Sequence, residues 1–375
     1  MKIAIVCDVL GQENNGTTIA AMNLVREMKK RGHEVTIVCS DTDKKDLDGY
    51  VIMPHLSLGP LNNYVKKNGV TLSRANKKVL EPVLIQSDVV HIMMPFMLGN
   101  AAVKLCKKND IPVTAGFHVQ AENFSTHIHM KDNSLANHIT YRKFYKSLYR
   151  HVDGIHYPTE FIRDLFEQAI GVKTKGYVIS NGVDERFKPL HSKKPHKFKD
   201  KYVILFTGRY SKEKCHRVLI DAAALSAHTR DIQLIFAGDG PLKKELKKHS
   251  EKLANQPVFS FFPHDQMLRV LNFADLYVHP SEIEIEAISC MEAIACGQVP
   301  IISDSPRSAT GRFALDDRNL FKNLDAQDLA DKIDFFIENP DVLEEYRERY
   351  KGMVDDFSQK TCMDKMEQMF FDVTE

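Results

Sequence analysis

Residues 2–8 read Lys-Ile-Ala-Ile-Val-Cys-Asp, and residues 34–39 read Glu-Val-Thr-Ile-Val-Cys. Both runs are short, apolar and rich in β-branched residues, which is typical of buried strands. Between them, the segment from Thr18 to Arg31 has apolar residues at helical spacing and is followed by Gly32, so we expect a helix there. A strand, a loop, a helix and a second strand in this order predict the opening of a parallel, doubly wound α/β sheet.

The same alternation continues along the chain and is interrupted once. A stretch rich in turn-forming residues, from Ser180 to Lys201, separates two series of predicted strands. We therefore expect two Rossmann-like domains, 1–179 and 180–358, and a C-terminal helix at about 359–375 that packs back on the first domain. In such folds ligands bind at the carboxyl ends of the strands, so the active site is expected in a cleft between the two domains. The predicted strands are 88–92, 112–117 and 154–157 in the first series, and 202–207, 232–237, 258–262, 276–278 and 299–302 in the second.

Composition excludes several classes of protein. The chain has 375 residues, of which 43% are hydrophobic and 27% charged, as in ordinary globular proteins. Its seven cysteines are scattered without zinc-type spacing, which favours a reducing compartment and no structural metal. The net charge of +1 argues against a nucleic-acid partner. Residues 1–8 are too short for a signal peptide, and no apolar run reaches membrane-spanning length. We therefore expect a cytoplasmic protein, either free or peripheral on the inner face of the cell membrane.

The segment from Ser281 to Gly297 carries the strongest chemical signal. It reads Ser-Glu-Ile-Glu-Ile-Glu-Ala-Ile-Ser-Cys-Met-Glu-Ala-Ile-Ala-Cys-Gly, with seven residues between Glu284 and Glu292. If a helix begins near Glu286, its N-terminus would favour a diphosphate. One glutamate could then accept hydrogen bonds from sugar hydroxyls and the other from a ribose diol. Two glutamates at this spacing also occur by chance on solvated helices.

Three further motifs precede this segment. Gly208 and Arg209 end a predicted strand, and Lys214 follows five residues after Arg209, so two cations stand where they could neutralise a departing diphosphate. The other two motifs are Gly238-Asp239-Gly240-Pro241 after the next strand and Phe262-Pro263-His264-Asp265 before a helix. Each motif alone is weak evidence for a function, but the order in which all of them follow one another along the chain is specific.

In this order the motifs resemble those of the GT-B glycosyltransferases of family 4, over nearly the whole chain. The resemblance implies that Arg209 and Lys214 bind the donor phosphates and that Glu284 and Glu292 form the family's Glu-x7-Glu motif. It also implies that His118 bonds the donor sugar and helps to stabilise the oxocarbenium-like transition state. The other residues that it implies in the donor site are Gly16, Thr17, Gly208, Gly238, Gly240, Ile285, Glu286 and Ala287.

One segment departs from the family pattern. Glycines usually follow the first glutamate of the motif, but this chain has Ile285, Glu286 and Ala287 there, so side chains crowd a backbone that should approach the sugar. Glu282 and Glu286 are alternative carboxylates for the same task. Which of Glu282, Glu284 and Glu286 contacts the sugar is left open.

The mechanism that the resemblance implies is a metal-independent transfer with retention of anomeric configuration. The donor is expected to be a UDP-sugar, with glucose as the default hexose, and no divalent metal or other cofactor is expected. Arg209, Lys214 and the helix N-terminus would do the work that a metal ion does in other transferases. The departing phosphate oxygen would take the acceptor proton, so no protein general base is nominated.

The acceptor is predicted from two observations. Residues 117–123 around His118 and residues 308–315 resemble the bacterial diacylglycerol and sterol α-glucosyltransferases, which implies a membrane lipid acceptor. Residues 141–150 carry aromatic residues on one helical face and cations on the other, which is typical of a helix on an anionic membrane surface. The same pattern is typical of an aromatic core face with a solvated basic side. The cations are Arg142, Lys143, Lys146 and Arg150.

Three alternative functions remain at this stage. A GT-B sugar-nucleotide epimerase would share the phosphate cations but need no acceptor. A transferase could act on a soluble glycan or small molecule instead of a lipid. A non-catalytic partner subunit would keep the fold and only bind. The sequence leaves open the donor sugar, the linkage and the oligomeric state.

Overall fold

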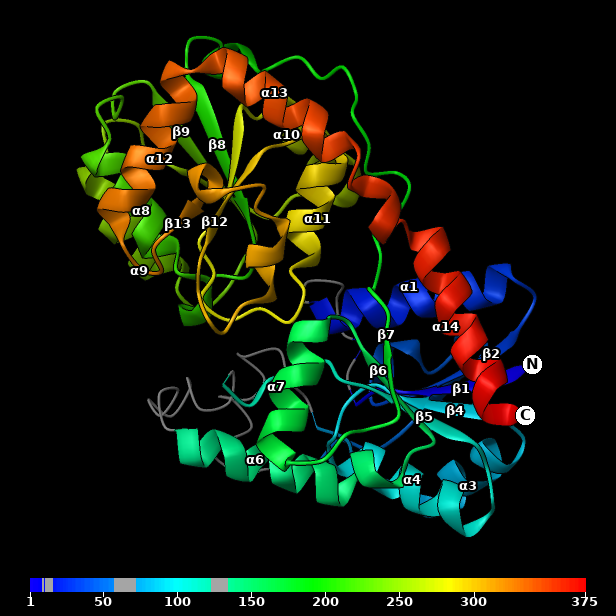
Figure 1. The fold of residues 1–375 in the computed structure, drawn as a ribbon. Helices are drawn as coiled ribbons and strands as arrows, with labels where there is room; N and C mark the ends of the chain where they lie inside the picture. The colour runs from blue at the N-terminus through cyan, green and yellow to red at the C-terminus, as the bar shows by residue number, and fades with distance from the viewer. Residues whose placement is uncertain (9, 11–15, 57–71, 123–133) are drawn as a thin grey trace. The chain divides into compact units, whose positions relative to one another are not determined.

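The computed structural model describes all residues of the 375 except 9, 11–15, 57–71 and 123–133 (Figure 1). The chain divides into two compact units. The first unit consists of Met1–Asn181 with Cys362–Glu375, and the second is Gly182–Thr361. Each unit is built on a parallel sheet with helices between its strands, which confirms the predicted α/β class with two Rossmann-like domains.

The first unit contains a seven-stranded parallel sheet in the order β3-β2-β1-β4-β5-β6-β7. The chain therefore starts in the middle of the sheet, moves to one edge, returns past β1 and continues to the other edge, as in doubly wound folds. Its strands are β1 (Lys2–Val6), β2 (Glu34–Cys39), β3 (Tyr50–Ile52), β4 (Val89–Ile92), β5 (Val113–Gly116), β6 (Gly154–Tyr157) and β7 (Gly176–Val178). Its helices are α1 (Gly16–Lys30), α3 (Lys77–Ile85), α4 (Met97–Lys108), α6 (Ser134–Ser147), α7 (Glu160–Ile170) and α14 (Gln359–Thr374), with short 3₁₀ turns η1 (Thr42–Lys44) and η3 (Tyr149–His151).

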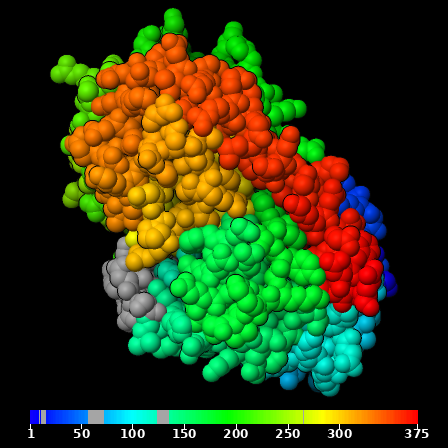
Figure 2. Space-filling model, viewed as in Figure 1, coloured from blue at the N-terminus to red at the C-terminus, as the bar shows by residue number. Residues whose placement is uncertain are grey.

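The C-terminal helix α14 packs on the first unit. Its buried side chains Met366, Met369 and Phe370 join the same apolar cluster as Ile3 and Ile5 of β1. In the ribbon and space-filling views, α14 in red lies against the blue N-terminal segment (Figures 1 and 2). The first unit is therefore completed by the last residues of the chain.

The second unit contains a six-stranded parallel sheet in the order β10-β9-β8-β11-β12-β13. Its strands are β8 (Tyr202–Thr207), β9 (Ile232–Ala237), β10 (Val258–Ser260), β11 (Leu276–His279), β12 (Pro300–Ser303) and β13 (Leu320–Phe321). Its helices are α8 (His216–Leu225), α9 (Lys243–His249), α10 (His264–Phe273), α11 (Ile288–Ala295), α12 (Ala326–Glu338) and α13 (Pro340–Lys351). The 3₁₀ turns are η4 (His196–Phe198), η5 (Lys212–Lys214), η6 (Ser250–Lys252), η7 (Ala309–Phe313), η8 (Asp317–Asn319) and η9 (Val354–Phe357).

Helix α6 decides between the two interpretations of residues 141–150. Tyr141, Phe144 and Tyr149 are buried, and the rings of Tyr141 and Tyr149 lie 6.1 and 5.0 Å from the ring of Phe117. The aromatic face is therefore part of the core, and the prediction that it inserts into lipid is wrong. The helix also ends at Ser147, before the end of the predicted segment.

The outer face of α6 is basic, with an apolar start. Arg142, Lys143 and Lys146 are exposed on it, and Arg150 is exposed just beyond the helix end. Leu135 and Ile139, about two turns and one turn before Arg142, are 68% and 58% exposed. Among the described residues, no helix combines the length and apolar composition needed to cross a membrane.

Candidate functional site

Several charged or polar side chains of the second unit gather at the carboxyl ends of β8 and β11. Arg209 and Lys214 follow β8, His279 is the last residue of β11, and Glu284 lies in the loop after it. Strands β8 and β11 are neighbours in the sheet, so their ends and the loops after them lie side by side. This edge is where ligands bind in doubly wound folds.

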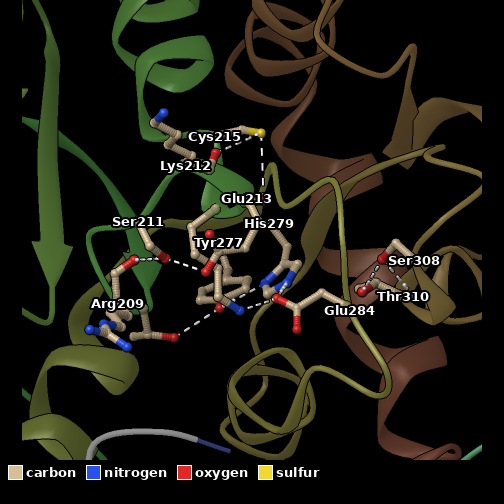
Figure 3. Close-up of polar contacts among 12 residues, drawn as sticks. Arg209, Ser211, Lys212, Glu213, Cys215, Tyr277, His279, Glu284, Ser308 and Thr310 are labelled. Carbon is tan, nitrogen blue, oxygen red and sulfur yellow. Dashed lines mark hydrogen bonds and ion pairs between the residues drawn. The ribbon is translucent and has the colours of Figure 1, made fainter. Parts of the chain in front are cut away.

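Glu284 is held by two partners that contact the same oxygen. The Nζ atom of Lys214 forms an ion pair with Oε1 of Glu284. Nε2 of His279 lies 3.0 Å from the same oxygen (Figure 3). Within the described part of the chain, no partner contacts the other oxygen, Oε2. Glu284 can therefore accept a hydrogen bond from a ligand hydroxyl without losing either partner.

A chain of hydrogen bonds fixes the orientation of His279. Because a carboxylate only accepts, Nε2 of His279 must donate to Glu284, and Nδ1 must then accept from the hydroxyl of Tyr277 at 3.2 Å. The Tyr277 oxygen accepts in turn from Thr207 at 2.8 Å. Burial lowers the pKa of His279, so the imidazole is neutral and keeps this single arrangement.

The charge of Glu284 is stabilised by the same partners. Burial alone would raise the pKa of the carboxyl group, but the charge of Lys214 and the hydrogen bond from His279 outweigh it and lower the pKa to about 2. Glu284 is therefore ionised at neutral pH.

The two alternative carboxylates are buried and engaged. Oε1 of Glu282 lies 2.8 Å from a guanidinium nitrogen of Arg307, and Oε1 of Glu286 lies 3.6 Å from one of Arg312. This arrangement favours Glu284 among the three candidates for contact with a ligand.

The backbone before α11 adopts a left-handed conformation that glycine favours, although no glycine is present there. Helix α11 begins at Ile288, two residues later than the start near Glu286 that we expected. Ala287 precedes it in the left-handed region, with φ of 63°. A β-carbon makes this conformation costly, by about 1–2 kcal/mol, so the position keeps the shape that glycine would favour.

This strain predicts the effect of a bulkier residue. We expect Ala287→Val to destabilise the protein by roughly 2 kcal/mol or more, because β-branched residues are rarely found at positive φ. Ala287→Gly should be close to neutral, since relief of strain offsets the greater entropy of the unfolded chain. Urea unfolding of the three proteins would measure this, and equal stability of Ala287→Val and wild type would contradict the assigned conformation.

The glycines of the Gly-Asp-Gly-Pro motif serve close backbone packing. A β-carbon on Gly238 would lie 2.0 Å from the carbonyl oxygen of Gly208, and one on Gly240 would lie 2.6 Å from that of Tyr210. Hydrogen bonds of 2.9 Å from Gly208 to Ala237 and 3.0 Å from Tyr210 to Asp239 join the two loops. The pair of loops thus forms a single support for Arg209.

Arg209 lies half-buried between these loops and the region of Glu284. Burial lowers the pKa of its guanidinium group, and the charge of Glu213 partly opposes this effect. Figure 3 shows its side chain separate from the Glu284 network. Arg209 and Lys214 both follow β8, so they lie at the same edge of the sheet. Lys214 is paired with Glu284.

Glu292 stands alone on α11. Within the described part of the chain its carboxyl group has no hydrogen bond or ion pair. Burial raises its pKa to about 8, and the negative charge of Asp184 adds to this effect. Glu292 is therefore mostly protonated at neutral pH in the protein without ligand.

The raised pKa makes stability depend on pH. In the unfolded chain Glu292 ionises near the ordinary glutamate pKa of 4.5, so wild-type stability is lost as pH rises from about 4.5 through about 8. Glu292→Gln removes this loss, and we expect it to be about 1–3 kcal/mol more stable than wild type at pH 9 and equal to it at pH 4. Urea unfolding at both pH values tests this, with exposed Glu251→Gln as the control. A stability difference that does not change between pH 4 and pH 9 would contradict the buried position of Glu292.

Three residues predicted for the donor site belong to the first unit: Gly16, Thr17 and His118. Gly16 and Thr17 are the first two residues of α1, at the carboxyl edge of that sheet, and no atom of the described residues lies within 4 Å of a β-carbon built on Gly16. His118 follows β5, and the neighbouring Asn123 is outside the described residues. The two units are described separately, so the predicted cleft between them stays a prediction.

His118 belongs to a group of three histidines that the sequence did not single out. His91 lies in β4 and His156 in β6, on either side of β5, and one nitrogen of each of the three rings lies within 4.8 Å of the others. His279 was also missed, as were the arginines at 307 and 312. Their position in the sequence could have indicated these histidines, because each lies within or just after a predicted parallel strand.

Comparisons with known proteins agree with this description. Residues 14–187 match the family described as Glycosyltransferase Family 4, and residues 187–353 match the family described as Glycosyl transferases group 1. The chain is similar to an alpha-monoglucosyldiacylglycerol synthase of Streptococcus pneumoniae, with 26% identity over 82% of this chain and 72% of that protein. It is also similar to a GDP-mannose-dependent alpha-mannosyltransferase of Corynebacterium glutamicum, with 25% identity over 80% of this chain and 72% of that protein.

A solved structure has the same fold. The Anabaena protein Alr3699/HepE in complex with UDP-glucose matches 99% of this chain and 100% of its own, with a TM-score of 0.76 and 16% identity. At this level of identity the likeness establishes the fold. The two-domain architecture deduced from the strand pattern is thus found in an independently determined structure.

Proposed function

The chain belongs to the GT-B glycosyltransferases of family 4, and on this basis we propose that it transfers glucose from UDP-glucose to the hydroxyl group of a membrane lipid with retention of configuration. The lipid is a diacylglycerol or a sterol. The observation that carries the proposal is Glu284, a carboxylate fixed by Lys214 and His279 through one oxygen and open at the other.

The donor half of the proposal rests on the second unit. An ionised carboxylate with one uncommitted oxygen is suited to a sugar hydroxyl, because hydrogen bonds to charged groups contribute about 1.5–3 kcal/mol. Glu292 is suited to a ribose diol, since its buried carboxyl group has no other partner among the described residues. Arg209, Lys214 and the N-terminus of α11 are the groups that would meet the diphosphate.

In the proposed step, the acceptor oxygen bonds to the anomeric carbon on the face from which the diphosphate departs. The bond from that carbon to the diphosphate oxygen breaks, and this oxygen takes the acceptor proton. Negative charge grows on the diphosphate as the bond breaks, so Lys214 and Arg209 stabilise the transition state more than the bound donor. The proposed step uses no metal ion.

The acceptor half rests on similarity and on surface charge. The pneumococcal relative carries diacylglycerol in its name. Exposed Leu135 and Ile139 on α6 precede three exposed cations of the same helix and Arg150 just beyond it, which is a surface suited to anionic lipid. A lipid acceptor at a membrane surface accounts for both observations.

His118 gives a prediction within this proposal. Its Nε2 atom is enclosed and points toward the other histidines, so Nδ1 is the atom that remains for a sugar hydroxyl. We expect His118→Ala to lower the turnover number by about 100-fold or more and to change the affinity for UDP by less than about threefold, since the residue acts on the developing oxocarbenium ion. Turnover assays and UDP titration would measure the two quantities. An unchanged turnover number would remove His118 from the reaction.

A donor and acceptor screen tests the proposed function. Purified protein is incubated with UDP-glucose, UDP-galactose or GDP-mannose, each with diacylglycerol vesicles, sterol vesicles, a soluble glycan mixture or no acceptor, and the products are identified by mass. We expect a hexosyl lipid from UDP-glucose only. Transfer from GDP-mannose would replace the donor with that of the corynebacterial relative, and a new sugar nucleotide formed without acceptor would indicate an epimerase. Binding of donor without turnover in any arm would indicate a non-catalytic subunit.

A further inference from the structure

The first unit contains three imidazole rings directed toward one point. They come from three neighbouring strands or strand ends: His91 from β4, His118 from the end of β5 and His156 from β6. His91 pairs in register with Thr114, and His156 with Gly116. Thr114 and Gly116 are two residues apart in β5, so all four positions share one face of the sheet.

Two of the rings present lone pairs, because their other nitrogen is used as a donor. Thr114 donates its hydroxyl hydrogen to the carbonyl of Val90 and so accepts from Nδ1 of His91 at 2.9 Å. Nε2 of His156 donates to the carbonyl of Ile179 at 2.7 Å. The facing atoms, Nε2 of His91 and Nδ1 of His156, are therefore unprotonated acceptors.

These facing atoms are buried without partners. Nε2 of His91, Nε2 of His118 and Nδ1 of His156 have no hydrogen-bond partner among the described residues, and His91 and His156 are 0% and 3% exposed. Buried acceptors without donors are unfavourable, and each calls for a ligand that the described residues do not supply.

The space between the rings depends on glycine. A β-carbon on Gly116 would lie 2.3 Å from Nε2 of His118 and 3.4 Å from Nε2 of His91. Any side chain at this position would occupy the point where the two nitrogens converge. Because Gly116 has no side chain, the space between these nitrogens stays open.

We propose that Nε2 of His91, Nε2 of His118 and Nδ1 of His156 form a binding site for one divalent transition-metal ion of the zinc type. Three neutral imidazoles with an open fourth position are a known ligand set for zinc, and ligand histidines that donate their second nitrogen to a carbonyl or hydroxyl oxygen are its usual support. Bonds of about 2.0–2.1 Å to zinc would place the nitrogens roughly 3.4 Å apart. The rings must move closer together on binding, because the nitrogens lie within 4.8 Å of one another without the ion.

The metal site lies in the first unit and shares His118 with the proposed transfer reaction, in which Nδ1 of the same ring would meet the sugar. Its test measures metal binding and does not depend on that reaction. With Nε2 on the metal, the proton of His118 stays on Nδ1, which fixes the tautomer of that ring.

Metal binding by the whole chain without a histidine tag tests the proposal. Zn²⁺ is titrated in competition with a chromophoric chelator, and bound metal is counted after equilibrium dialysis. We expect one Zn²⁺ per chain in the wild type and at least about a 100-fold weaker affinity in His91→Phe. His216→Phe is the matched control, because His216 is equally buried in the second unit and its ring packs at a tilt against those of Phe206 and Phe236. Its affinity should equal that of the wild type.

A pair of milder variants keeps the test decisive if His91→Phe does not fold. Thr114→Val removes the oxygen that orients His91, and we expect about 10- to 100-fold weaker Zn²⁺ binding, whereas Thr114→Ser should restore it. The proposal is overturned if the wild type binds no stoichiometric Zn²⁺ at micromolar concentration. It is equally overturned if His91→Phe binds Zn²⁺ as tightly as the wild type. If His91→Phe does not fold, the same result for Thr114→Val overturns it.

Discussion

Replacing Lys214 with alanine should lower the turnover number of glycosyl transfer by about 100- to 1000-fold, the usual cost of removing a group that stabilises developing charge. Lys214 is expected to meet the diphosphate as it departs, so its loss should affect turnover more than donor affinity. The same change removes the ion pair with Glu284, whose carboxylate is almost completely buried. An unpaired buried charge costs about 3 kcal/mol or more, so the free energy of unfolding should fall as well.

Two further variants separate these effects. In Lys214→Ala combined with Glu284→Gln, the buried charge is gone, and we expect most of the stability to return while turnover stays low. Lys212→Ala removes an exposed lysine two residues away and should leave both quantities unchanged. Turnover of Lys214→Ala equal to that of the wild type would refute the role of Lys214 in the reaction.

Replacing Arg142, Lys143, Lys146 and Arg150 with glutamine should abolish cosedimentation with anionic vesicles. Each cation near an anionic surface contributes roughly 1 kcal/mol, so four of them change vesicle affinity by a factor on the order of 1000. The aromatic face of α6 is buried in the core, so the cations and the exposed Leu135 and Ile139 are what this surface offers to lipid. Raised salt should have the same effect on the wild type.

A variant with the same change of charge in the second unit is the control. Lys199, Lys244, Lys247 and Lys248 are exposed and form no ion pair within the described chain. Their replacement by glutamine should leave vesicle binding within about threefold of the wild type, because the basic surface of α6 is intact. Hydrolysis of the donor should be equal in both variants. If the wild type does not bind anionic vesicles at low salt, the lipid acceptor is refuted.

Much of the fold was predictable because its central strands are continuous apolar runs. Strands β1, β2, β6, β8 and β9 have the bounds expected from the sequence to within two residues. The edge strands β3, β7 and β13 were missed, since they are two or three residues long and several of their side chains are partly exposed. The aromatic pattern on α6 was ambiguous, because core burial and lipid insertion require the same spacing.

The candidate site was predictable in its residue types and less so in its geometry. Motif order pointed to Lys214 and Glu284, but spacing alone did not show that they form an ion pair or that His279 shares the same oxygen. The left-handed conformation of Ala287 could not be predicted from the sequence, because alanine gives no signal for positive φ. The histidine cluster depends on strand order, which joins residues up to 65 positions apart, from His91 to His156.

The most direct test of the proposed function is the anomeric configuration of the lipid product. The protein is incubated with UDP-glucose and vesicles that contain diacylglycerol or sterol, and the product is examined by proton NMR. The donor carries an α linkage, so retention predicts an α-glucosyl lipid with the small coupling constant of an equatorial anomeric proton. A β-glucosyl lipid would contradict the retaining mechanism, and absence of any glucosyl lipid alongside an active soluble acceptor would contradict the lipid acceptor.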